Sequence, residues 1–132
     1  MAKTKGYVYF TIVTEDKNLD ISDFNKYISL KPTKFMKKYE RGKIPKSTNW
    51  DYSSGDLVNP YYFEEIEKLI KILTPHTEEF KLFKLHNPTC VLRLVVVIFL
   101  GDETPGLNFS ENTINFINDL GGSIDCDIYN RK

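Results

Sequence analysis

The pattern of apolar and polar positions is dominated by one long apolar run, residues 91–100, which contains a single charge, Arg93. An apolar run of this length that ends at Gly101-Asp102 is typical of a strand in the interior of a sheet. Residues 7–13 and 123–129 alternate between apolar and polar side chains, which predicts two further strands with one buried face each. The run at 91–100 is therefore expected to lie at the centre of the sheet.

Other segments indicate helices and less regular structure. Ser22 is a suitable N-cap for a short helix that ends before Pro32. Residues 60–73 begin with Pro60 and place apolar side chains at helical spacing, with Phe63, Ile66, Leu69, Ile70 and Leu73 as the expected core stripe. Residues 110–120 predict a third helix, which Ser110 caps and Gly121-Gly122 ends. Residues 47–53 predict an edge strand, and 79–85 predict a short strand or an extended approach to 91–100.

The order of these elements suggests a repeat. A strand, a polar loop and a short helix occur near the N-terminus and again from residue 91 onward. This order predicts an α+β fold, a ferredoxin-like two-layer sandwich with helices on one face of a mostly antiparallel sheet of about four or five strands, plus one added helix. The length of 132 residues fits one domain, 1–132.

Alternation along the strands places Arg93 on the less apolar face of the central strand. Asp125, Asp127 and Tyr129 share one face of the closing strand, opposite Ile124, Cys126 and Ile128. If both strands lie in one sheet, Arg93 and an aspartate can meet on that face. The residues then form either a structural cross-strand ion pair or a ligand-binding group. Cys126, on the apolar face, is expected to be a small core residue.

Charge is balanced overall, with 18 basic and 18 acidic residues, but it is unevenly distributed. Residues 31–46 carry seven basic side chains and one acidic one, and residues 101–130 carry six carboxylates and no basic residue. The basic stretch, which includes Lys37, Lys38 and Arg41, is followed by Trp50 and Tyr52. Trp50 fits core packing, a partner interface or a platform for nucleic-acid bases.

The usual catalytic and metal-binding patterns are missing from the sequence. The two histidines, His76 and His86, and the two cysteines, Cys90 and Cys126, form no zinc-type spacing, and no glycine-rich loop precedes a helix. His76 is interpreted as a cation at a helix end. No catalytic residue, metal site or cofactor is therefore expected. The N-terminus has no signal-peptide pattern and no segment is long enough to span a membrane, so a cytoplasmic location is the expectation.

The chain resembles the bacterial family known as domain of unknown function 4279. Tyr9-Phe10, Ile21-Ser22, the segment 30–33 and the isolated Trp50 follow the order seen in that family, as do residues 106–110. The ending, residues 120–129, is the most specific match. The resemblance implies a small soluble bacterial protein and brings no established catalytic residues.

These observations favour a non-enzymatic interaction protein, and one form of this hypothesis is an immunity protein that neutralises a toxin. The expected partner surfaces are Trp50 and Tyr52 with Lys37, Lys38 and Arg41, and the group of Arg93, Asp125, Asp127 and Tyr129. One alternative is a protein that binds a small anion or metal, or an unrecognised enzyme, which uses Arg93 and the two aspartates. The other is a single-stranded nucleic-acid binder that uses residues 31–46.

Overall fold

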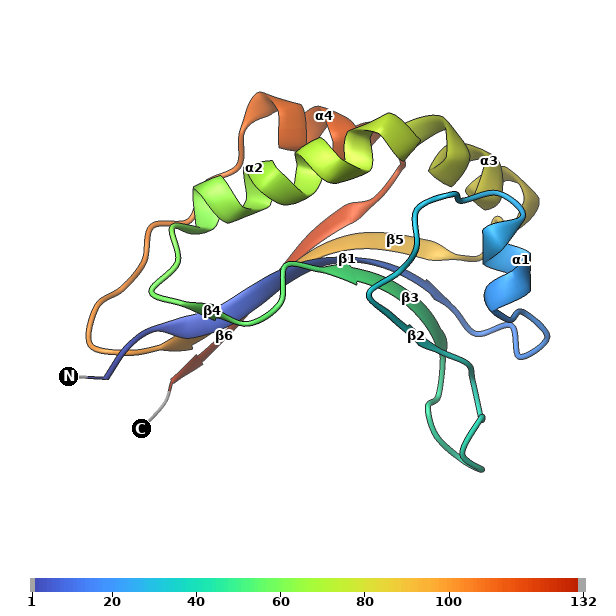
Figure 1. The fold of residues 1–132 in the computed structure, drawn as a ribbon, viewed down its shortest axis with the longest axis horizontal. Coiled ribbons are helices and arrows are strands. Elements are labelled where there is room, and N and C mark those ends of the chain that lie inside the picture. Colours follow the sequence, from blue (N-terminus) through green and yellow to red (C-terminus); the bar gives the residue numbers. More distant parts are fainter. Residues whose placement is uncertain (1, 131–132) are drawn as a thin grey trace.

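The computed structural model describes residues 2–130, which form one mixed sheet with helices on a single face (Figure 1). The strands are β1 (Lys5–Thr14), β2 (Lys34–Met36), β3 (Thr48–Ser53), β4 (Leu57–Val58), β5 (Val91–Leu100) and β6 (Ser123–Asn130). The helices are α1 (Ile21–Asn25), α2 (Tyr62–Leu73), the 3-10 helix η1 (Thr74–His76), α3 (Thr77–His86) and α4 (Glu111–Asp119). The α+β class, the mostly antiparallel pairing and the single helical layer were predicted from the sequence.

The two long apolar strands, β1 and β5, are the central neighbours of the sheet, as expected. The order of strands is β2-β3-β1-β5-β6, and β4 also pairs with β1. β1 and β5 run antiparallel over nine paired positions, from Lys5–Phe99 to Val13–Val91. Their helix-facing side chains are fully or almost fully buried: Val8, Phe10, Ile12, Leu92, Leu94, Val96 and Ile98. This face and the helices above it form the main hydrophobic core.

The ferredoxin-like topology is not confirmed. That topology would separate β5 from the closing strand by inserting β1 between them. Here β6 instead pairs directly with β5, in parallel, and forms the outer edge of the sheet. α4 makes the crossover that a parallel pair requires. The described sheet also has six strands rather than four or five, because β2 and the two-residue β4 add short pairings to β3 and β1.

The segment predicted as a strand at 79–85 is helical. α2 ends at Leu73, as the range 60–73 predicts, but Pro75 then lies at the start of η1, where its missing N–H breaks no helical hydrogen bond. The chain therefore continues through η1 into α3, whose Phe80 and Phe83 are fully buried. Because these rings lie three positions apart, a helix turns both toward the core, whereas a strand would place them on opposite faces.

Helix boundaries differ from the expectations in two places. Asp20, not Ser22, is the N-cap of α1: its side chain accepts a hydrogen bond from the Ser22 N–H, and Asp23 completes a capping box. α2 begins at Tyr62 rather than at Pro60. Ser110 caps α4 as predicted, since its hydroxyl accepts a hydrogen bond from the Thr113 N–H.

Two apolar residues that were assigned to the core are on the surface. Phe63 on α2 is exposed, and so is Cys126 on β6. Tyr62 takes the place expected for Phe63: its buried hydroxyl donates to the carbonyl oxygens of Lys5 and Val97. Gly6 makes this approach possible, because a Cβ there would lie 2.4 Å from the Tyr62 hydroxyl.

None of the helices within residues 2–130 has both the length and the apolar character that crossing a bilayer requires.

Candidate functional site: the open face of the sheet

The face of the sheet turned away from the helices carries the chemically most varied set of side chains. It lies on the lower side of the sheet in Figure 1, and the β2–β3 connection projects on that side. Strand pairing aligns Tyr9 with Val95 and Ser53, and Thr11 with Arg93 and Asp51. The parallel pairing then places Asp125 beside Val95, Asp127 beside Val97, and Tyr129 beside Phe99. We call these aligned side chains the open face.

Polar groups gather around Tyr9 on the open face. The Thr11 hydroxyl donates a hydrogen bond of 2.5 Å to a carboxylate oxygen of Asp51 on the neighbouring strand. Burial raises the pKa of Tyr9 to about 12; the charges of Asp51 and Asp127 add to the rise, and Arg93 opposes it. The Tyr9 phenol therefore stays protonated at neutral pH and is available as a hydrogen-bond donor.

Burial also raises the pKa of Asp51, although the hydrogen bond from Thr11 and the charge of Lys34 both act to lower it. Alternation along residues 7–13 places Tyr9 and Thr11 on the face opposite Val8, Phe10 and Ile12, but Asp51 was not identified from the sequence. The sequence did contain a signal for Asp51, because alternation along β3 places it on the other face of the strand from Trp50 and Tyr52.

Arg93 and the two aspartates share the open face, as expected, but the predicted ion pair is not formed. Arg93 pairs in register with Ser123, so Asp125 and Asp127 lie two and four positions further along β6. Among residues 2–130, no ion pair or hydrogen bond engages the Arg93 side chain. Arg93 as a residue is partly exposed, and its guanidinium is thus available to an anionic group from outside.

Aromatic side chains flank these charges. The rings of Tyr7 and Tyr9 lie 5.8 Å apart on β1, and those of Phe99 and Tyr129 stack at 5.3 Å across β5 and β6. Tyr129 is 50% exposed. Aromatic rings and arginine are the residue types that protein interfaces favour, whereas the carboxylates beside them are not enriched there.

The other predicted surface, Trp50 and Tyr52 with the neighbouring lysines, does not exist as expected. Trp50 is fully buried and packs edge-on against Phe10 and Phe80, so core packing is the alternative that holds. Tyr52 lies on the same helix-facing side and is partly buried against the core. The strand alternation had already placed both on one face, but it could not tell which face the helices cover.

The basic residues lie in and next to the β2–β3 connection. Lys38 donates to the carbonyl oxygen of Glu15 at 3.0 Å and lies over the Tyr39 ring, while Arg41 is exposed in a tight turn closed by a bridge to Ile44. Lys37 is half-buried. Because Trp50 is enclosed in the core, its ring cannot stack on bases beside this basic stretch. This weakens the nucleic-acid alternative.

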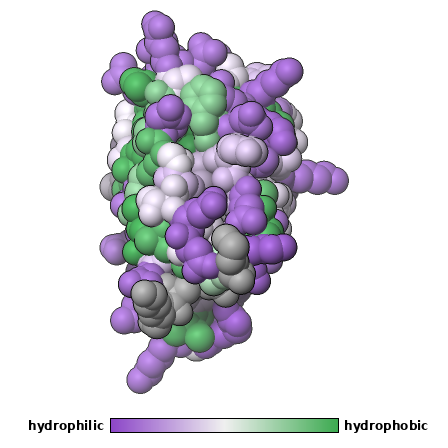
Figure 2. Space-filling view, turned by 90° about the vertical axis from the view of Figure 1, so that its left-hand side faces the viewer, coloured by the Kyte–Doolittle hydropathy of each residue, from purple (hydrophilic) through white to green (hydrophobic). Residues whose placement is uncertain are grey.

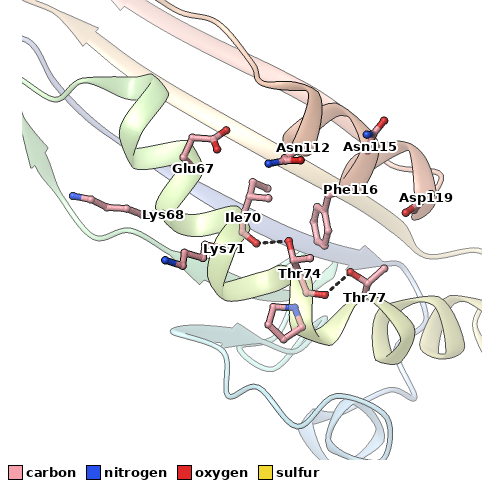
Figure 3. Close-up of a pocket in the computed structure, with 11 residues that line it drawn as sticks. Glu67, Lys68, Ile70, Lys71, Thr74, Thr77, Asn112, Asn115, Phe116 and Asp119 are labelled. Carbon is pink, nitrogen blue, oxygen red and sulfur yellow. Dashed lines mark hydrogen bonds between the residues drawn. The ribbon is translucent and has the colours of Figure 1, made fainter.

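A groove of about 680 Å³ lies between α2 and α4 on the helical layer (Figure 3). Its hydroxyls already have partners: Thr74 donates to the Ile70 carbonyl and Thr77 donates to the Thr74 carbonyl. Lys68 and Lys71 point away from α4, and Glu67 accepts hydrogen bonds from Ser110 and Thr113, which ties α2 to the start of α4. The polar side chains that line the groove from α4 are Asn112, Asn115 and Asp119.

Within residues 2–130, the remaining titratable groups show no catalytic arrangement. His76 lies at the junction of η1 and α3 rather than at a free helix end, and its Nδ1 atom is 3.2 Å from a Glu79 oxygen. Burial raises the pKa of the Cys90 thiol; it does the same for Cys126, where the nearby carboxylates raise it further, so neither is an activated nucleophile. Residues 2–130 contain no group of three or more metal-ligating side chains.

Comparison with known proteins places the chain in a family but gives no solved relative. The family described as domain of unknown function (DUF4279) matches residues 3–131. No curated protein and no solved structure matches the chain. The match covers almost the full length, including all the strands that form the open face, and the chain therefore belongs to the DUF4279 family.

Proposed function

We propose that this protein is a non-enzymatic interaction protein that binds a protein partner through the open face of its sheet. The observation that supports this most directly is Arg93, a partly exposed residue whose guanidinium is unpaired among the described residues and lies between aromatic rings and carboxylates. A carboxylate of the partner can form a charge-assisted, bidentate pair with this guanidinium. The exposed ring of Tyr129 adds apolar contact area on the same face, six positions along β6 from Ser123, the residue that pairs with Arg93.

An immunity or toxin-neutralising role is the form of this proposal that we favour. Such a protein acts by occupying a surface of its target and needs no chemistry of its own. The raised pKa values of both thiols fit a protein without an active nucleophile. The open face carries both signs of charge, which favours a specific orientation of the partner over general attraction to one charge.

The test uses affinity capture from the native host to isolate a partner. The affinity of the purified partner for the protein and its variants is then measured. Charge reversal by Arg93→Glu and removal of the ring by Tyr129→Ala should each weaken binding by about tenfold or more, which corresponds to about 1.4 kcal/mol. Lys71→Glu, on the helical layer, is the matched control and should leave the affinity unchanged. Equal affinities for all three variants would refute the open face as the binding surface. Relief of growth inhibition when the chain is expressed with its partner tests the immunity form.

A small anionic ligand is the second candidate, because the same unpaired Arg93 would suit it. A cavity of about 330 Å³ borders Arg93 at the ends of β1 and β5, but Glu15 and Asp16 also line it. These carboxylates disfavour an anion there. A thermal-shift series with phosphate, sulfate and nucleotides separates the candidates, since a ligand that binds the native state raises Tm with concentration.

A further inference from the structure

We infer that β6 is a docking edge for an extended segment of the partner, which adds to the sheet as a further strand and carries basic residues at alternate positions. β6 ends the strand order, so one side of its backbone has no neighbouring strand within the described residues. It is eight residues long and exposed along most of its length. This inference rests on the proposed function, because it specifies how the partner engages the rim of the open face.

The helix-facing side of β6 leaves apolar groups uncovered. Ile128 is 55% exposed, and Cys126 is also exposed, although their neighbours on β5, Ile98 and Val96, are buried. Figure 2 looks onto the end of the molecule where β4 and β6 end, and apolar surface gathers along one side of that view. An added strand would bury apolar side chains of its own against this strip.

The opposite side of the same edge is acidic. Asp125 and Asp127 lie two residues apart on the open face, and residues 101–130 contain no basic side chain. In a strand that pairs with β6, the side chains next to these aspartates are two residues apart as well. Lysine or arginine at those positions would form opposite-charge cross-strand pairs, so the edge selects a segment in which basic and apolar residues alternate.

A second copy of this chain fits the edge poorly. Two β6 strands that pair antiparallel, with their open faces aligned and most of their length in contact, place an aspartate opposite an aspartate. Like charges directly opposite each other destabilise a strand pair. Charged side chains on an edge strand are a common means of preventing such self-association. The acidic pair therefore excludes the protein's own copy and admits a basic partner.

The test uses fluorescently labelled octapeptides as probes, one alternating lysine with valine and one alternating glutamate with valine. We expect the lysine peptide to bind and the glutamate peptide to fail. The double variant D125K/D127K should invert this preference, with each change in affinity about tenfold or more. Ile128→Lys should weaken binding, whereas Leu85→Lys, at an exposed apolar site on α3, should not. Hydrogen exchange should show slower exchange of β6 amides in the complex.

The outcomes separate this inference from the proposed function. If Arg93→Glu weakens capture of the partner while the β6 variants bind it normally, the open face is the site and strand addition at β6 is wrong. If the lysine peptide binds without slowing exchange in β6, the contact is only electrostatic, and the inference is also wrong. A dimer formed through β6 in sedimentation experiments would likewise overturn the choice of a basic partner. If neither set of variants affects capture, both proposals fail.

Discussion

The Asp51 carboxylate, one residue of the open face, is held in a position that costs the native state some free energy. It is half-buried, and its direct hydrogen-bond donor is the Thr11 hydroxyl. Burial raises its pKa, which means that the folded protein holds a proton on this group more tightly than the unfolded chain does. The contribution of Asp51 to stability is therefore most favourable below its unfolded pKa and is lost as pH rises through the folded pKa.

Replacing Asp51 with asparagine should stabilise the protein at neutral pH by less than about 1 kcal/mol, since the site keeps part of its solvation. The amide oxygen can still accept the hydrogen bond from Thr11, and no charge is buried. The gain over the wild type should shrink as pH falls below the ordinary range of an aspartate pKa. Urea unfolding at several pH values measures it. Asp56→Asn, in an exposed turn, is the control, and a gain that grows toward acid would contradict the sign.

Trp50 offers a second test at the scale of one residue, because it is the only tryptophan in the chain. Its ring is fully buried, and its indole N–H has no hydrogen-bond partner among the described residues. We expect iodide to quench its fluorescence several-fold less in the native protein than in urea. Binding of a partner should leave this quenching unchanged. Strong quenching in the native state would show that the ring is exposed and would restore it as an interface candidate.

At the scale of elements, hydrophobic periodicity predicted the long strands and helices well. It failed where one residue type suits two different positions, and where the relation between strands matters. The strands 91–100 and 7–13 have one fully apolar face each, so the burial of that face could be predicted from the sequence. The end of α2 at Leu73 was predicted correctly, but the helix that follows was missed, because proline not only ends a helix but also suits the first turn of the next one. The ion pair of Arg93 failed for a different reason: alternation fixes the face of a side chain, but not its register with the neighbouring strand.

One contact between elements holds the end of α4 in place. The Lys84 ammonium group on α3 donates to the carbonyl oxygens of Leu120 and Gly121, at 3.1 and 3.2 Å. These carbonyls follow the last turn of α4, where a positive charge interacts favourably with the helix dipole. Gly121 adopts φ +62°, which lets the chain reverse directly into β6. Lys84 therefore helps to set the position of the proposed docking edge.

Lys84→Met should destabilise the protein by about 1 kcal/mol, because the side chain keeps most of its packing but loses its hydrogen bonds and charge. Chemical unfolding at neutral pH measures this change. Lys81→Met on the same helix is the matched control and should cost much less, since Lys81 forms an ion pair with exposed Glu78, at 3.7 Å. Equal losses for the two variants would show that capping of α4 contributes little.

For the molecule as a whole, the sequence predicted the separation of charge but not its geometry. The basic stretch 31–46 includes β2 and the acidic stretch 101–130 includes β6, and these strands are the two opposite edges of the sheet. The order of strands that produces this arrangement depends on the parallel pairing of β5 with β6. No local pattern distinguishes that pairing from the ferredoxin-like one, because both use the same strands and helices.

This arrangement predicts a gradient of stability across the sheet. β1 pairs with β3, β4 and β5, and its helix-facing side chains are fully buried, whereas β6 has one neighbouring strand and is mostly exposed. Local opening should therefore be least frequent in β1 and β5 and most frequent at the edges. Native-state hydrogen exchange should find the slowest amides, which open only with global unfolding, at Val8, Phe10, Leu94 and Val96. β6 amides should exchange through smaller openings that depend weakly on denaturant. Uniform exchange across all strands would mean that β6 is as firmly held as the centre, and an edge so rigid would gain little order from the addition of a partner strand.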